Sequence, residues 1–170
     1  SVTTENIFPV IRQWLYSGKD IFVRELVSNC PDAIAKHKRL VTLGEAEASE
    51  DDYKITVTYD DDAKTISFED NGIGMSAEEV EKYISQIAFS GAVDFVTKYQ
   101  EQSTDKSGII GHFGLGFYSA FMVADKVTID TKSYVKDEES VRWVSEDGMD
   151  YELSDSKKTG RGTVITLELS

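Results

Sequence analysis

Strand-like and helix-like segments follow one another along this chain in an order that few folds accommodate. Four segments in its last third are typical of strands and are joined by short turns: 126–132, 141–146, 151–154 and 163–169. The part before them predicts a hairpin and several helices, with strands at 53–59 and 64–69 and helices at 20–40, 76–89 and 117–124. This order lacks the regular strand–helix–strand alternation of a doubly wound sheet. We therefore expect an α+β fold, a two-layer sandwich in which helices cover one face of a mixed, mostly antiparallel sheet.

Charge and composition narrow the classes of partner. The 170 residues fit one domain, and 18 Lys and Arg against 31 Asp and Glu give a net charge of −13. A duplex-binding protein normally presents a basic face, so we expect no nucleic-acid partner. No apolar run approaches the roughly 18–20 residues that cross a bilayer, so we expect no membrane partner either. The single cysteine, Cys30, excludes an internal disulfide and a multi-thiolate zinc site and fits a cytoplasmic protein.

The helix predicted at 20–40 carries a polar stripe of unusual composition. At about 100° per residue, Glu25, Asn29, Asp32 and Lys36 fall within one narrow arc, opposite an apolar face. A solvated helix face usually carries long Lys and Glu side chains, whereas the short side chains in this stripe lower helix propensity. The stripe could simply face water, but its composition favours a wet, charged pocket.

Two glycine-containing segments lie next to predicted helix starts. The first ends a strand with Asp70 and continues through Gly72 and Gly74, so that a carboxylate could accept hydrogen bonds from an amino group on a base. The second, 108–117, has four glycines whose exposed backbone N–H groups could bind phosphate. It is neither a Walker A loop nor a dinucleotide fingerprint, because no Gly-Lys-Ser/Thr follows and Ser119 stands where the third glycine belongs. Tight turns between packed elements remain the plain alternative for both segments.

Taken together and in this order, these segments resemble the N-terminal ATP-binding domain of the ninety-kilodalton heat-shock chaperone family, and its bacterial members look closest. The matching motifs span 21–33, 70–75, 110–121 and 162–163, and the similarity runs from 5 to 169. The motif at 70–75 is shared with gyrase subunits, mismatch-repair ATPases and histidine kinases, whereas the segments around Glu25 and Phe117 are more specific to the chaperone. The resemblance implies a Bergerat-type fold and an ATP-dependent chaperone domain that binds ATP or ADP with Mg²⁺ and belongs to a slow ATPase.

The resemblance also implies a role for each matching residue. Glu25 would be the general base that orients the attacking water, and Asn29 would bind Mg²⁺. Asp70 would accept from the adenine amino group, assisted through water by Gly74 and Thr163. The remaining nucleotide-binding positions would be Asp32, Ala33, Lys36, Ile73, Met75, Gly111, His112, Phe113, Gly114, Leu115, Gly116 and Phe117.

The same resemblance implies a domain organisation. Residues 1–170 would form a single ATP-binding domain, with 76–110 as a mobile lid. The family's middle domain, which supplies an arginine to the terminal phosphate, and its C-terminal dimerisation domain would be absent from this chain. We therefore expect the isolated domain to be a monomer with almost no turnover, and the full-length protein to be a homodimer that assists unfolded or partly folded client proteins.

Two departures from the family pattern concern the site, and two other interpretations stay open. Pro31 lies inside the helix that carries Glu25 and Asn29, where it removes a hydrogen bond and should bend the helix. Phe89 stands where many members carry a lysine, so one phosphate contact would be missing. The alternatives are another ATPase or kinase of the same fold group, of the topoisomerase, mismatch-repair or histidine-kinase type, and an interaction domain with a degenerate, non-hydrolysing pocket.

Overall fold

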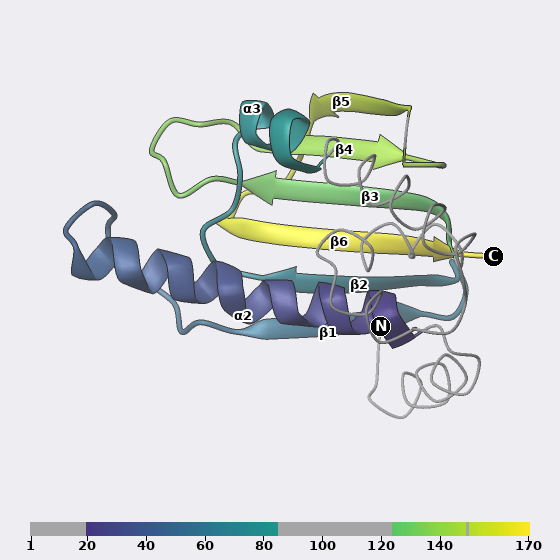
Figure 1. Ribbon diagram of the computed structural model, residues 1–170, viewed down its shortest axis with the longest axis horizontal. Coiled ribbons are helices and arrows are strands. Elements are labelled where there is room, and N and C mark those ends of the chain that lie inside the picture. Colours follow the sequence, from purple (N-terminus) through teal and green to yellow (C-terminus); the bar gives the residue numbers. More distant parts are fainter. Residues whose placement is uncertain (1–19, 85–123, 149) are drawn as a thin grey trace, which may run out of the picture.

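The computed structural model describes residues 20–84, 124–148 and 150–170 (Figure 1), and for 20–28, 83 and 84 it describes the backbone. A long helix and the strands of a sheet carry most of these residues, with a short helical segment between the second and third strands. Their bounds are α2 Asp20–Thr42, β1 Ile55–Asp60, β2 Thr65–Asp70, α3 Ala77–Glu79, η1 Val80–Ile84, β3 Ala124–Lys132, β4 Val141–Ser145, β5 Tyr151–Asp155 and β6 Gly162–Leu169. The order of elements expected from the sequence is confirmed over these ranges.

The strands form one six-stranded sheet whose order is β1-β2-β6-β3-β4-β5. Each pair of neighbours in this sheet is antiparallel. Strand β6, which comes last in the sequence, lies between β2 and β3 (Figure 1). Its register sets Thr163 opposite Asp70 on one side and opposite Thr131 on the other. Three residues that are distant in the sequence therefore become neighbours across three adjacent strands.

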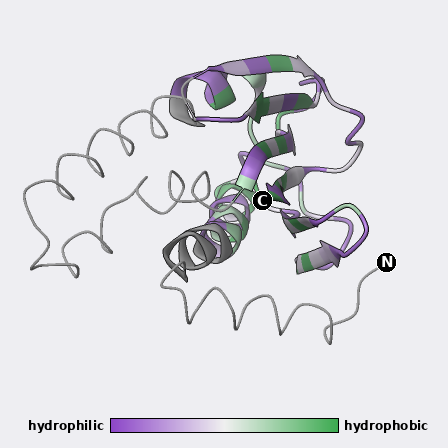
Figure 2. Cartoon of the chain, turned by 90° about the vertical axis from the view of Figure 1, so that its right-hand side faces the viewer, coloured by the Kyte–Doolittle hydropathy of each residue, from purple (hydrophilic) through white to green (hydrophobic). Residues whose placement is uncertain are grey.

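Alternate residues of the strands build the hydrophobic core under helix α2. On β2, for example, Ile66 and Phe68 are fully buried while Glu69 between Phe68 and Asp70 is exposed. Figure 2 shows α2 nearly end-on against one face of the sheet, and Cys30 of this helix belongs to the core. In the part of the chain that the structure describes, no helix has both the length and the apolar character needed to cross a bilayer. The expected two-layer α+β arrangement is confirmed.

Local details differ from the expectations in two places. Ser76 and Glu79 form the expected capping box, but the α-helix ends at Glu79 and continues as a π-helical turn, Val80–Ile84. The prediction of an α-helix is therefore wrong over Val80–Ile84, because hydrophobic spacing does not distinguish the i→i−4 from the i→i−5 hydrogen-bond pattern, and its last part, 85–89, lies outside the described residues. Ala124, expected to end a helix, begins β3 instead, because it pairs with Leu169 of β6. Helix α2 continues through Pro31, and the bend expected there stays a prediction.

Candidate functional site

A row of three buried polar residues crosses the sheet at the ends of β2, β6 and β3. Asp70, Thr163 and Thr131 have exposed fractions of 5%, 8% and 0%. They are brought together by the register of β6, which pairs Thr163 with both of the others. Buried polar side chains need hydrogen-bond partners, so such a row beneath a helix marks a structural network, a ligand site or both.

Thr131 is the centre of this network. Its Oγ1 accepts from the backbone N–H of Met75 at 3.0 Å, lies 2.8 Å from Thr163 Oγ1 and is 3.1 Å from the carbonyl oxygen of Gly162. A hydroxyl has one proton, so when Thr131 donates to Gly162, Thr163 must donate to Thr131. In that arrangement Thr163 offers only lone pairs to a further partner, such as a water molecule or a ligand donor.

Asp70 is a buried carboxylate whose partners among the described residues include the Gly72 N–H and the Cys30 thiol. Its Oδ1 accepts from the backbone N–H of Gly72 at 2.9 Å. Burial raises the pKa of Asp70 to about 6, against the opposing effects of this N–H, the Cys30 thiol and the Lys158 ammonium, while the Glu69 charge raises it further. The pKa of the Cys30 thiol is raised to about 12, first by burial and then by the charge of Asp70. A buried carboxylate whose pKa is held high by desolvation is a candidate for recognition of a donor group.

The loop after Asp70 packs between α2 and the end of β3. The N–H of Ile73 donates to the carbonyl of Ala33 at 3.0 Å, and its carbonyl accepts from the N–H of Tyr134 at 2.9 Å. Gly72 approaches the helix so closely that a Cβ would lie 2.4 Å from the carbonyl carbon of Ala33. Gly74 has a φ of +65°, and a Cβ there would lie 1.8 Å from the carbonyl oxygen of Lys132. The glycines singled out in the sequence are therefore required by close backbone packing at both positions.

This packing predicts different costs for alanine at two glycines with similar backbone angles. Gly74→Ala should destabilise the fold by about 3–5 kcal/mol, because it adds a backbone clash to the strain of a positive φ. Gly44→Ala is the matched control: Gly44 has a φ of +77°, but no atom lies within 4 Å of the position that a Cβ would take. Left-handed strain alone should cost it about 1 kcal/mol. Urea unfolding midpoints measure both, and equal losses would contradict the close approach at Gly74.

Four of the predicted site residues lie on α2 with described side chains. Asn29 and Ala33 are half-buried, whereas Asp32 and Lys36 are exposed. Ala33 contacts the loop after Asp70 through its carbonyl, and so joins the same site. The exposure of Asp32 and Lys36 fits a wet pocket and an ordinary solvent face equally well.

Other predicted site residues lie outside the described part of the structure. The backbone of Glu25 belongs to α2, but its side chain is not among those described. Also outside are Phe89 and the predicted phosphate-binding residues Gly111, His112, Phe113, Gly114, Leu115, Gly116 and Phe117. Among the described residues, no group of three or more His, Cys, Asp and Glu side chains could hold a metal ion. The described geometry therefore concerns the part of the site around Asp70.

Two residues at this site are not singled out by the sequence. Thr131 repeats the inward spacing of Val127 and Ile129 and looks like one more strand position. Arg161, next to Lys158 in a basic cluster, donates to the backbone carbonyls of Asn71 and Gly72. An arginine directly before a strand that carries Gly162 and Thr163 is the one signal that could have indicated it.

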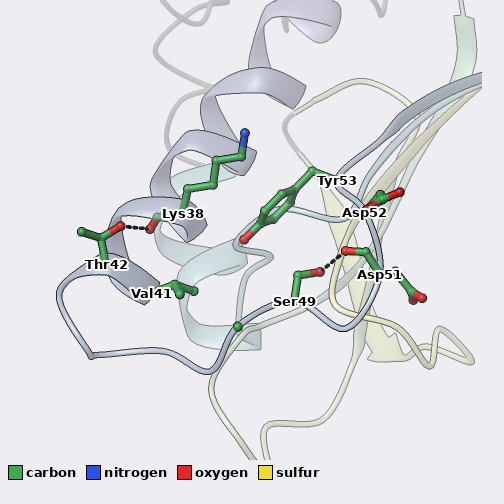
Figure 3. A pocket seen from close by; sticks show the side chains of 8 residues that line it. Lys38, Val41, Thr42, Ser49, Asp51, Asp52 and Tyr53 are labelled. Atoms are coloured by element: carbon green, nitrogen blue, oxygen red, sulfur yellow. Dashed lines mark hydrogen bonds between the residues drawn. The ribbon is translucent and has the colours of Figure 1, made fainter.

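A separate cleft opens on the outer side of α2. It lies between the last turns of this helix and residues 48–53, and is lined by Lys38, Thr42, Ser49, Asp51 and Tyr53 among others (Figure 3). The Lys38 ammonium lies 5.1 Å from the centre of the Tyr53 ring. Asp51 is exposed, and a second carboxylate follows it in the sequence. The cleft is therefore a poor site for an anion, and the row around Asp70 remains the candidate.

Comparison with known proteins gives one family and several close relatives. Residues 16–161 match the sequence profile of the family described as "Histidine kinase-, DNA gyrase B-, and HSP90-like ATPase". The chain is 49% identical over 168 residues to "Chaperone protein HtpG" of Porphyromonas gingivalis, covering 99% of this chain and 24% of that protein. It is 51% identical over 166 residues to the protein of that name from Bacteroides thetaiotaomicron, covering 98% of this chain and 24% of that protein. The protein of that name from Psychromonas ingrahamii is 42% identical over 171 residues, covering 99% of this chain and 27% of that protein. The chain thus spans about a quarter of the length of these relatives.

Proposed function

This chain belongs to the family of histidine kinase-, DNA gyrase B- and HSP90-like ATPases, and from that premise we propose that it is the nucleotide-binding domain of an ATP-dependent protein-folding chaperone. The family gives it the α+β Bergerat-type ATPase fold, and with it ATP as the ligand class. The names of its relatives favour the chaperone over a kinase or a topoisomerase. DNA-stimulated turnover, or phosphate transfer to a histidine, would favour those alternatives instead.

The observation that carries the proposal is the buried carboxylate of Asp70, whose raised pKa reflects its burial. One of its oxygens accepts from Gly72 N–H, and the other is proposed to accept from the adenine amino group. Thr163 and the backbone at Gly74 would assist through water, since Thr163 keeps lone pairs for a further donor. The base would lie against Ala33, Ile73 and Met75, which are half-buried around the same loop; they are the apolar side chains that we assign to the adenine site.

A degenerate interaction domain is the other class of function to consider. A buried carboxylate with a raised pKa lowers the stability of the ligand-free fold, as would be expected where the charge serves a ligand. An interaction domain that had lost its ligand would gain stability by replacing Asp70. The retained Asp70 therefore favours a functional nucleotide site.

Mg²⁺ is part of the proposal, with the protein supplying few of its ligands. Among the described residues, Asn29 offers a half-buried amide on the helix beside the site, and no cluster of acidic ligands accompanies it. That donor set fits Mg²⁺, which keeps several waters and often binds through one or two protein groups plus substrate phosphates. The ion would neutralise charge on the phosphates. Asp32 and Lys36 on the same helix are assigned to the nucleotide site as well, and the amides of residues 111–117 would cradle the phosphates.

The longer protein and its partners are proposed from the relatives. We assign residues 1–170 to one ATP-binding domain with a lid at 76–110, followed in the full-length protein by further domains. The relatives are named as chaperones, so the partners would be unfolded or partly folded client proteins. The isolated domain would be a monomer and the full-length protein a cytoplasmic homodimer, without a nucleic-acid partner.

Binding of ADP with Mg²⁺ tests the proposal directly on this chain. At about 100 times the dissociation constant, a ligand stabilises a fold by about 2.7 kcal/mol. For a domain of this size the melting temperature should therefore rise by roughly 5–10 °C. GDP with Mg²⁺ is the control: guanine presents a carbonyl where adenine presents its amino donor, so its shift should be much smaller. A flat melting temperature up to millimolar ADP would reject the proposed function.

A further inference from the structure

The guanidinium of Arg161 is bonded to the backbone of the loop that follows Asp70. Its Nε donates to the carbonyl oxygens of Asn71 and Gly72 at 3.2 and 3.0 Å. Its Nη2 donates to the Asn71 carbonyl at 2.7 Å and to Ser49 Oγ at 3.0 Å. One side chain thus holds two successive carbonyls of the loop and ties them to the segment before β1.

The two carbonyls held by Arg161 belong to peptide groups whose N–H groups donate hydrogen bonds to Asp70 and to Ala33. The structure has no cis peptide bond among the described residues, so each carbonyl points opposite to the N–H of its own planar peptide group. The Asn71 carbonyl shares a peptide group with the Gly72 N–H, which donates to Asp70 Oδ1 at 2.9 Å. The Gly72 carbonyl shares one with the Ile73 N–H, which donates to the Ala33 carbonyl of α2 at 3.0 Å. Holding the two carbonyls therefore orients both N–H groups.

The arginine is itself held from outside the loop. Its guanidinium carbon lies 5.7 Å from the centre of the Tyr53 ring, and the Tyr53 hydroxyl is 2.7 Å from Nδ1 of the buried His37. The Asn71 side chain adds a second tie, because it accepts from Lys54 N at 2.8 Å and donates to the Asp52 carbonyl at 2.9 Å. Figure 3 shows Tyr53 and Ser49 on the wall of the outer cleft, with the Tyr53 ring directed toward the helix and the Ser49 hydroxyl bonded to the Asp51 carbonyl at 2.6 Å. The segment 49–54 thus contacts the arginine through Ser49 and Tyr53 and limits its movement.

We propose that Arg161 is a positioning residue for nucleotide recognition: it clamps the peptide groups of residues 71–73 so that the Gly72 N–H fixes the orientation of the Asp70 carboxylate toward the base. The proposal rests on the proposed function, because it assigns Asp70 to adenine. A planar fork with several donors can hold two carbonyls at once, whereas a lysine ammonium provides a single point of attachment. Arg161→Lys therefore keeps the charge and removes the clamp.

The test compares Arg161→Lys and Arg161→Ala with Arg142→Lys in the 170-residue chain. Arg142 is the matched control, since it is an exposed strand arginine paired with Asp130 at 3.0 Å, away from the loop. ADP affinity at pH 7.5, measured calorimetrically with Mg²⁺, should fall about tenfold in Arg161→Lys and further in Arg161→Ala, and should stay within about twofold in the control.

A second readout separates positioning from simple loss of stability and needs no nucleotide. The Gly72 N–H lowers the pKa of Asp70, so loosening it should raise that pKa above about 6 in the ligand-free protein. Carbon-13 NMR of the Asp70 carboxyl follows this titration; Cys30, Lys158 and Glu69, the other groups that act on Asp70, are unchanged in each variant. If Arg161→Ala does not fold, the ADP affinity and the Asp70 titration of Arg161→Lys test the proposal.

The outcomes distinguish this inference from the proposed function. If the wild-type chain binds ADP and folded Arg161→Lys binds it with the same affinity, the clamp is overturned. It is also overturned if the variant binds ADP more weakly while the pKa of Asp70 does not change. A raised Asp70 pKa together with weakened ADP binding would establish it. If the wild-type chain does not bind ADP, the proposed function fails, and the clamp then fails as a recognition device even where the titration moves.

Discussion

Asp70→Asn is expected to abolish ADP binding while making the ligand-free protein more stable. The carboxylate accepts from an amino donor, but an amide can present its own N–H there and leave the base unsatisfied. Losing a charge-assisted hydrogen bond in a buried site costs about 1.5–3 kcal/mol, which is more than tenfold in affinity. Calorimetric titration measures this loss. Unchanged affinity in a folded variant would show that Asp70 is not the adenine partner.

The gain in stability follows from the pKa of Asp70. Burial raises it from 3.8 to about 6, so the folded protein keeps its proton in a pH window where the unfolded chain has released it. Stability therefore falls as pH rises from about 4 to 6, and the deficit is complete above this window; the shift corresponds to roughly 3 kcal/mol. The neutral asparagine avoids this deficit. Its melting temperature should exceed that of the wild type by about 5–10 °C at pH 7 and should match it near pH 4.

Asp130→Asn is the control for this variant. Asp130 lies on β3, which β6 separates from the strand of Asp70, and is hydrogen-bonded to Arg142 and Ser156, outside the row around Asp70. The substitution should leave ADP affinity unchanged and should not stabilise the fold. A stabilised Asp130→Asn would indicate that the effect at Asp70 comes from overall charge, since this protein carries a net charge of −13.

Glu25→Ala is expected to remove ATP hydrolysis while leaving ADP binding intact. Glu25 precedes Asn29 by one helical turn on α2, at the end of the site assigned to phosphate, whereas Asp70 is assigned to the base. A carboxylate there can take a proton from the attacking water, and losing such a base typically slows a reaction by about 10²–10⁴-fold. Phosphate release is measured in the full-length protein, because the resemblance places an arginine for the terminal phosphate in a later domain.

Two further variants make the Glu25 result specific. Glu25→Gln keeps the size of the side chain but cannot accept the proton, so it should lose turnover like Glu25→Ala. Glu152→Ala removes an exposed carboxylate from the edge strand β5 and should hydrolyse ATP at the wild-type rate. Wild-type turnover in Glu25→Ala would leave Glu25 as an ordinary helix-face charge, and the catalytic assignment would have to be withdrawn.

Much of the fold can be predicted from local patterns, but the arrangement of its strands cannot. Alternation along β2 and β3 reveals the buried faces, and the capping box at Ser76 reveals a helix start. The insertion of β6 between β2 and β3 depends on pairings between residues such as Thr65 and Glu168 that are about a hundred positions apart. No local signal encodes such a register, which is set by packing across the whole sheet.

The same distinction applies to the site. Asp70 is predictable because a strand end, a carboxylate and two glycines follow one another in the sequence. Thr131 is not, since its role arises from facing Thr163 on the adjacent strand β6. Arg161 also escapes prediction, because a basic residue among lysines usually faces solvent and its partners are backbone carbonyls, which every residue has. In the proposed site, local sequence indicates the side chain assigned to the ligand more readily than the one assigned to orient it.

The position of β6 has a consequence for synthesis on the ribosome. Of the described strands it emerges last, yet it occupies the middle of the sheet and supplies Thr163 opposite Asp70. Until it emerges, β2 and β3 each present an unpaired edge, which is a template for intermolecular pairing. Contacts over such long separations also form slowly. A nascent chain therefore completes the proposed nucleotide site and pairs these two edges in the same step. A truncated product lacking Gly162–Leu169 would lack Thr163 of the proposed site and would be prone to aggregate.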